Sequence, residues 1–211
     1  TGSVGKTTTK ELIHSALMPL GRITSTRDNN NNDIGVPITL LSATAKDSAV
    51  VVEMGMRGLG QIERLSKCSR PDIAVITNIG SAHKAILGSR KNIAIAKCEI
   101  TSFLNSDGVV IVVEGDSLLE DVLSSKWHGR VVRVGIQLLN SDNSISHNKR
   151  QISEINNQVD ILGILDKENW KITVDDLSFK LPLAGQHNAT NFVLALAVAN
   201  ELDIPFNSIT K

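Results

Sequence analysis

The chain opens with TGSVGKTTT (residues 1–9), which contains the second half of the phosphate-binding motif G-x-x-x-x-G-K-[ST]. Glycines in this motif let backbone N–H groups close around phosphate oxygens, and the N-terminus of the following helix adds partial positive charge. The motif predicts that Lys6 reaches the β- and γ-phosphates of a nucleotide and that the Thr7 hydroxyl binds Mg²⁺. The predicted nucleotide-binding residues of the loop are Gly2, Ser3, Val4, Gly5, Lys6, Thr7 and Thr8. The alternative is a chance turn with the same letters before a helix.

This motif normally joins a strand to a helix, and the chain continues with the same alternation. Continuous apolar runs predict buried parallel strands at residues 49–52, 72–77, 109–113 and 131–134. Helices are predicted at residues 6–17, 38–45, 58–68, 89–104, 117–126 and 185–202, with Ser89 as an N-cap. Strands that alternate with helices in this way predict an α/β fold with a mostly parallel sheet, flanking helices and a phosphate-binding loop.

The pattern changes in the second half of the chain. Residues 137–158 are polar and predict a loop. Three short strands, which would form an antiparallel edge on the main sheet, are predicted at 159–165, 170–174 and 177–181.

The first glycine of the phosphate motif would fall one position before Thr1, and the strand that feeds the loop would lie before it. The last residues of the chain resemble the opening of another helix. We therefore expect this chain to be the interior of a longer protein.

Charge and composition exclude several classes of protein. The 211 residues include 22 basic and 22 acidic side chains, and a net charge of zero argues against an electrostatic nucleic-acid binder. No apolar run approaches the roughly 18 residues that a membrane span needs. The two cysteines, Cys68 and Cys98, fit a reducing compartment better than a disulfide framework. We expect a cytoplasmic protein with no nucleic-acid partner and no membrane span.

Two polar residues follow predicted strands at the sheet edge where α/β proteins bind ligands. Glu53 ends the strand at 49–52 and could hold Mg²⁺, and the alternative is a solvated acid at a strand end. His83 lies on the loop after the strand at 72–77 and could be a metal ligand or a general base. The alternative for His83 is an exposed loop histidine.

Lys97 lies in the apolar stripe of the helix predicted at 89–104. A lysine in such a stripe either snorkels to the surface or is desolvated. Desolvation lowers the pKa of an ammonium group and frees a nucleophilic amine. A neutral amine can also take up CO₂ as a carbamate, which replaces a cation by an anion that binds metal. Periodicity alone leaves both alternatives open.

Three polar residues open the last predicted helix: His187, Asn188 and Asn191. The two asparagines are three positions apart and therefore share a helix face. Their side-chain amides could recognise the edge of an adenine base. The alternative is that they cap the N-terminus of the helix, a role for which asparagine is well suited.

Several segments, in the same order, resemble the signatures of the Mur ligase family of ATP-dependent amide-forming enzymes. They are TGSVGKTTTKE (1–11), VVEMGMRGLGQIERLS (51–66), PDIAVITNIGSAH (71–83), GSRKNIAIAKCEI (88–100) and GQHNATNFVLALAVA (185–199). NNNNDIGVPITLL (29–41) resembles an asparagine-rich loop that sets one member of this family apart. The resemblance covers nearly the whole chain.

The resemblance implies a domain organisation. Residues 1–204 match the central ATP-binding domain of the family, without its first strand. Residues 205–211 match the start of a connection to a C-terminal domain. The N-terminal domain, which holds a uridine nucleotide in this family, would also lie outside this chain.

The resemblance also implies individual roles. Lys6 and Thr7 match the phosphate-loop pair, Glu53 matches the carboxylate that holds a first Mg²⁺, and His83 matches a ligand of a second Mg²⁺. Lys97 matches the lysine that is carbamylated in this family, and its carbamate would help to hold the second ion. The implied catalytic residues are Lys6, His83 and Lys97, and the implied metal ligands are Thr7, Glu53, His83 and Lys97.

The remaining implied roles concern substrates. His187, Asn188 and Asn191 match nucleotide contacts. Asn29, Asn31 and Asn32 match the asparagine loop near the γ-phosphate and the acyl substrate.

The implied activity is amide-bond formation in peptidoglycan synthesis, with ATP and two Mg²⁺ ions. ATP would phosphorylate the terminal carboxylate of UDP-N-acetylmuramoyl-tripeptide, and the amine of D-alanyl-D-alanine would attack the acyl phosphate. We expect the enzyme to be a monomer. The alternatives are a sibling ligase that adds a single amino acid, a folylpolyglutamate synthetase, and a nucleotide-binding module without ligase activity.

Overall fold

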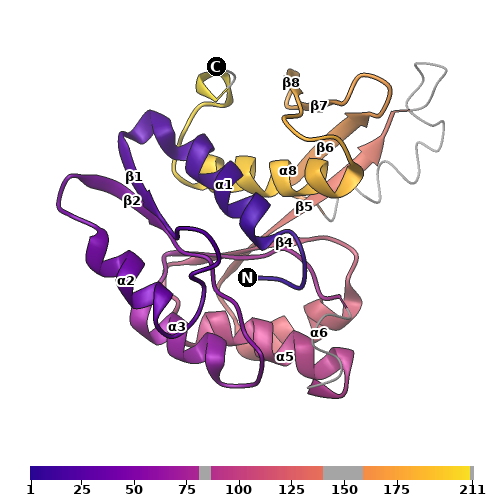
Figure 1. The fold of residues 1–211 in the computed structure, drawn as a ribbon. Coiled ribbons are helices and arrows are strands. Elements are labelled where there is room, and N and C mark those ends of the chain that lie inside the picture. The colour runs from indigo at the N-terminus through magenta and orange to yellow at the C-terminus, as the bar shows by residue number, and fades with distance from the viewer. Residues whose placement is uncertain (81–86, 140–158, 210–211) are drawn as a thin grey trace.

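A computed structural model describes residues 1–80, 87–139 and 159–209 (Figure 1). Its helices are α1 (Lys6–Leu17), α2 (Gly35–Ser42), α3 (Gln61–Ser69), α5 (Arg90–Cys98), α6 (Ser117–Lys126) and α8 (Gln186–Glu201). Its strands are β1 (Arg22–Ser25), β2 (Asp47–Val51), β3 (Ile73–Ile76), β4 (Val109–Val113), β5 (Arg130–Leu138), β6 (Ile161–Asp166), β7 (Lys171–Val174) and β8 (Leu177–Lys180). Short 3₁₀ turns are η1 (Met18–Leu20), η2 (Glu99–Phe103) and η3 (Phe206–Ser208).

The strands form two sheets. β1 and β2 pair in parallel, and the second sheet has the order β3-β4-β5-β6-β7-β8. β3 to β6 are parallel to one another, whereas β7 and β8 add an antiparallel edge. The predicted α/β class, with a mostly parallel sheet and a short antiparallel edge, is confirmed. Antiparallel pairing starts between β6 and β7, since β6 itself is parallel to β5.

Helices cover both faces of the larger sheet. α1 and α8 lie on one face, and α3, α5 and α6 lie on the other (Figure 1). Alternate residues of β4 contact the two layers: Val109 and Ile111 pack in the cluster of α1 and α8, and Val110 and Val112 pack in the opposite cluster. Burial on both faces explains why this strand is a continuous apolar run.

The structure corrects several predicted helix boundaries. α3 begins at Gln61, not at residue 58, because Gly60 has a φ of 77° that a helix cannot contain. α2 begins three residues earlier than predicted. The helix predicted at 89–104 ends at Cys98 and continues as the 3₁₀ turn η2. The predicted N-cap is confirmed, since the Ser89 side chain accepts a hydrogen bond from the N–H of Asn92.

The structure also adds one strand and extends another. β1 was not predicted, because Arg22–Ser25 contains a single large apolar residue and gains its strand conformation from pairing with β2. β5 continues to Leu138 through its pairing with β6, so the loop predicted from residue 137 starts later. The rest of that predicted loop, residues 140–158, lies outside the described residues.

Within the described ranges, no helix combines the length and the apolar character that a membrane crossing needs.

Candidate active site

The phosphate loop enters α1 with uncapped backbone donors. Gly5 precedes the helix with a φ of 78°, a left-handed conformation that glycine adopts without strain. No side chain caps this helix end, and its first turn carries no acidic residue. The hydrogen-bonded ladder begins with Thr9 N–H, which leaves the N–H groups of Lys6, Thr7 and Thr8 before it. This end of α1 is suited to bind an anion, as the sequence predicts.

Residues just after β3 hold the phosphate loop from behind. Asn78 Oδ1 accepts a hydrogen bond from Val4 N–H at 3.1 Å, and Asn78 Nδ2 donates to the Val4 carbonyl at 3.0 Å. The Thr77 hydroxyl donates to the same carbonyl at 2.7 Å, and the Ser3 hydroxyl accepts from Gly80 N–H at 2.9 Å. Sequence analysis missed the roles of Thr77 and Asn78. Their position at the carboxyl end of a parallel strand was the available signal.

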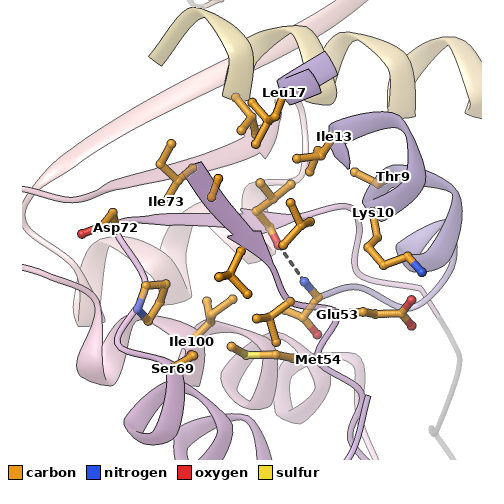
Figure 2. Close-up of a pocket in the computed structure, with 18 of the residues that line it drawn as sticks. Thr9, Lys10, Ile13, Leu17, Glu53, Met54, Ser69, Asp72, Ile73 and Ile100 are labelled. Carbon is orange, nitrogen blue, oxygen red and sulfur yellow. Dashed lines mark hydrogen bonds between the residues drawn. The ribbon is translucent and has the colours of Figure 1, made fainter. Parts of the chain in front are cut away.

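A groove of about 440 Å³ separates the two sheets beside this loop (Figure 2). It runs between β2 and β3 and is lined mainly by apolar side chains, among them Ile13 of α1 and Ile100 of η2. Thr1 lies in it in the register of a parallel strand, since its amine donates to the Val75 carbonyl at 2.8 Å and its carbonyl accepts from Thr77 N–H at 2.9 Å. The groove is therefore bordered by the edge of β2 on one side and by the edge of β3, to which Thr1 is hydrogen-bonded, on the other.

Glu53 follows β2 and is only 3% exposed. Its N–H donates to the Thr26 hydroxyl at 2.9 Å, which fixes the backbone, and its Oε1 accepts from Asn31 Nδ2 at 2.7 Å. Its Oε2 is buried without a hydrogen-bond partner among the described residues. The alternative of a solvated acid at a strand end is wrong. A buried carboxylate oxygen without a donor is costly, and a cation would satisfy it.

Lys97 lies on α5 and is 1% exposed, so the snorkelling alternative is wrong. Burial, and then the nearby charge of Lys6, lower the pKa of Lys97 from 10.5 to about 8. Among the described residues, no carboxylate forms an ion pair with its ammonium group. A large part of the amine is therefore neutral near pH 8, in the form that reacts as a nucleophile.

The groove marks the region where these groups meet. Lys6 and Glu53 both line it, and the charge of Lys6 acts on the buried ammonium group of Lys97. Lys6 comes from α1, Glu53 from the end of β2 and Lys97 from α5. The fold thus brings three predicted site residues together from distant parts of the sequence.

The asparagine loop (residues 29–32) uses two of its side chains within the chain. Asn32 Oδ1 accepts hydrogen bonds from the N–H groups of Ile34 and Gly35, which stabilises the start of α2. Asn31 binds Glu53, whereas Asn29 is exposed. Of the three loop residues assigned to the substrate by resemblance, Asn31 lies directly beside another site residue.

The three polar residues that open α8 lie in different environments. Asn191 is buried against the phosphate loop, because a Cβ added to Gly5 would lie 2.8 Å from its Oδ1. Asn188 Nδ2 donates to the carbonyl four residues earlier, and His187 is exposed. No side chain caps the N-terminus of α8, so the alternative role of N-cap is wrong for both asparagines.

The described residues fit a cation that binds together with nucleotide phosphates. No three His, Cys, Asp or Glu side chains converge within the described ranges. The available oxygen donors are Glu53 Oε2 and the hydroxyl of the exposed Thr7. Such hard oxygen ligands suit Mg²⁺, which usually takes one or two protein ligands and completes its shell with phosphate and water. His83 lies outside the described residues.

Comparison with known proteins agrees with this geometry. The Mur ligase middle domain matches residues 1–199. The chain belongs to the Mur ligase family. This Mur ligase chain is 38% identical over 209 residues to UDP-N-acetylmuramoyl-tripeptide–D-alanyl-D-alanine ligase of Synechocystis sp., a match that covers 99% of this chain and 41% of that protein. It is 37% identical over 201 residues to the ligase of the same name from Bacillus subtilis, with 93% and 39% covered.

Solved structures of Mur ligases have the same fold. MurF from Acinetobacter baumannii superposes with a TM-score of 0.83 at 30% identity, over 99% of this chain and 43% of that one. MurF ligase from Thermotoga maritima in complex with ADP superposes with a TM-score of 0.74 at 24% identity, over 97% and 44%. The family and fold predicted from the sequence are confirmed. The chain spans about two fifths of the length of the curated relatives that it matches.

Proposed function

We propose that this Mur ligase chain is the ATP-binding part of an enzyme that joins D-alanyl-D-alanine to UDP-N-acetylmuramoyl-tripeptide. The observation that carries the proposal is the buried Oε2 of Glu53, which has no partner among the described residues and lies in the same groove as Lys6, whose charge acts on Lys97. The names of the relatives from Synechocystis sp. and Bacillus subtilis support the substrates. The ADP bound to the Thermotoga maritima enzyme supports the nucleotide.

The proposed reaction must overcome the repulsion between two anions, ATP and the carboxylate of the substrate. ATP would phosphorylate the tripeptide carboxylate to give an acyl phosphate and ADP, and the dipeptide amine would then displace phosphate to form the amide. The first step brings two anions together, and preorganised positive groups lower that barrier. The N-terminus of α1 and Lys6 would hold the β- and γ-phosphates. Glu53 and Thr7 would hold Mg²⁺, which offsets phosphate charge when it is bound.

Lys97 would act as a carbamate. The ammonium group first loses one proton; the neutral amine then adds CO₂ to form an N–C bond and loses a second proton to solvent, so that a cation becomes an anion. Burial, and then the charge of Lys6, lower the pKa of Lys97, and the carbamate removes the repulsion from Lys6. It also places a second anionic group near Glu53, and with His83 it would hold a second Mg²⁺.

The nucleotide base and the acyl substrate would meet the remaining predicted residues. His187, Asn188 and Asn191 would lie along the nucleotide, and the buried position of Asn191 against Gly5 supports this. Asn29 is the member of the asparagine loop whose exposure suits a substrate contact.

The domain organisation is likewise a proposal. Residues 1–204 would form one domain, and the groove between β2 and β3 would hold a further parallel strand that leads into Thr1. The parallel register of Thr1 beside β3 and the apolar lining from helices on both faces support this. Residues 205–211 would begin a connection to a C-terminal domain, and an N-terminal domain would hold the uridine nucleotide. The enzyme would be cytoplasmic and monomeric.

The test uses the full-length polypeptide that contains this chain. Phosphate release from ATP is measured with UDP-N-acetylmuramoyl-tripeptide, with and without D-alanyl-D-alanine, and the product is identified by mass spectrometry. We expect release to require both substrates and to yield a heavier nucleotide-linked peptide. Release that needs a free amino acid in place of the dipeptide would assign a sibling ligase. The absence of substrate-dependent release would indicate a binding module.

A further inference from the structure

Asn31 fastens the asparagine loop to the segment that follows β2. The side-chain Nδ2 of Asn31 donates to Glu53 Oε1 at 2.7 Å, and the backbone carbonyl of Asn31 accepts from Gly55 N–H at 2.8 Å. Gly55 also leaves space for the Asn31 side chain, since a Cβ at that position would lie 2.5 Å from Asn31 Oδ1. The side chain of Asn31 is thus held between the carboxylate and the backbone two residues further along.

The contact with Glu53 distinguishes the two carboxylate oxygens. A side-chain NH₂ group can only donate, so it fixes the carboxylate oxygen that it binds. The other oxygen, Oε2, is left buried without a partner among the described residues. Hydrogen bonds of this kind orient metal-binding carboxylates in many proteins and raise their affinity for the ion.

We propose that Asn31 is a positioning residue that presents Glu53 Oε2 to a divalent cation bound with the nucleotide phosphates. It acts through Glu53, in place of the substrate contact that the family resemblance implies. This inference rests on the proposed function in one respect, namely that Glu53 is a cation ligand. It predicts that Gly55, which makes no contact with nucleotide or metal in this scheme, influences metal affinity through Asn31.

The test measures binding of Mn²⁺ alone as the probe ion, by electron paramagnetic resonance, to the full-length polypeptide saturated with ADP. Asn31→Ala should weaken Mn²⁺ binding about tenfold, the lower end of the usual effect of removing such a partner. The affinity for ADP without metal should stay the same. The matched control is Asn30→Ala, because Asn30 is exposed in the same loop, and it should leave Mn²⁺ affinity unchanged.

A second variant reaches the same contact from the other side. Gly55→Ala adds a methyl group where the Asn31 amide lies and should displace that amide from Glu53. Its Mn²⁺ affinity should fall to a similar extent. The double variant Asn31→Ala/Gly55→Ala should bind Mn²⁺ no more weakly than Asn31→Ala, because both changes remove the same contact between Asn31 and Glu53. Gly55→Ala also serves if Asn31→Ala does not fold, as judged by thermal unfolding.

Glu53→Gln separates this inference from the proposed function. Loss of Mn²⁺ binding in Glu53→Gln, with normal binding in Asn31→Ala and Gly55→Ala, would overturn the role of Asn31 and leave the proposed function intact. Normal Mn²⁺ binding in Glu53→Gln would show that Glu53 is not a cation ligand. That result would overturn both the role of Asn31 and the role proposed for Glu53. Additive losses in the double variant would also overturn the inference, because they would show that Gly55 acts independently of Asn31.

Discussion

The two sheets that border the groove are held in place by different kinds of contact. In the six-stranded sheet, β4 pairs with strands on both sides, and Val110, Ile111 and Val112 are fully buried. Among the described strands, β2 pairs with β1 alone, and Val50 of β2 is 38% exposed. Apolar packing therefore dominates one side of the groove and contributes much less to the other.

Polar contacts compensate on the side of the smaller sheet. The Lys10 ammonium of α1 is buried and donates to the Thr26 carbonyl at 2.6 Å, just beyond β1. The Thr26 hydroxyl in turn accepts from Glu53 N–H. Lys97 lies on α5, which packs against the six-stranded sheet. The position of Glu53 depends instead on the hydrogen bonds that join Lys10, Thr26 and the Glu53 backbone. This difference predicts that substitutions affect the two site residues by separate routes.

The largest effect expected is on catalysis, where both sides of the groove are needed. Lys97→Ala in the full-length polypeptide should lower turnover roughly a hundredfold or more, because it removes charge that stabilises the transition state. A small carboxylate such as acetate should restore part of the activity, and phosphate release measures both effects. Lys91→Ala, at an exposed position of the same helix, is the control. Normal turnover in Lys97→Ala would contradict the carbamate.

The packing difference itself can be measured by truncation of one residue in each sheet. Ile111→Ala should lower the free energy of unfolding by about 3–4 kcal/mol, within the usual range for a buried isoleucine. Val50→Ala should cost less than about 1 kcal/mol, because its side chain already contacts water. Chemical denaturation of both variants provides the comparison. Equal costs would show that β2 is packed as firmly as β4.

The pH dependence of stability should reveal the desolvated lysine. The pKa of Lys97 is about 8 in the folded protein and 10.5 when unfolded, so its charged form destabilises the fold below pH 8. Wild-type stability should therefore rise by roughly 2–3 kcal/mol between pH 8 and 10.5, relative to Lys97→Met. The measurement needs buffers free of CO₂, so that no carbamate forms.

Burial of Cys98 raises the pKa of its thiol to about 12, which acts in the opposite direction above pH 9. This contribution is present in both proteins and cancels in their difference. A flat difference between wild type and Lys97→Met across this range would show that Lys97 is solvated.

The smallest effect is expected at the polar link of the smaller sheet. Lys10→Met should lower the free energy of unfolding by about 1–2 kcal/mol, because a buried carbonyl loses its donor. Amide hydrogen exchange should become faster in β1 and β2 and stay unchanged in β4. Lys46→Met, at an exposed position, should change neither quantity. Uniform exchange across both sheets would mean that Lys10 does not link α1 to β1 specifically.

Sequence reasoning was most successful where a segment is governed by its own pattern. The run VVIVV at 109–113 and the amphipathic helix at 6–17 have their predicted bounds, because burial on fixed faces determines both. β1 was missed because its strand conformation comes from pairing with β2, which no local pattern reveals. Lys97 could be selected by periodicity, but its desolvation depends on what packs around α5. The contacts of Asn31 and Asn78 depend on tertiary structure alone.

Two parallel strand edges, one of β2 and one of β3, border the groove beside Thr1. Such edges can pair with a further strand. A strand in this groove would join the two sheets into one, so that Glu53 after β2 and Thr77 after β3 would lie at the same carboxyl edge of a continuous sheet.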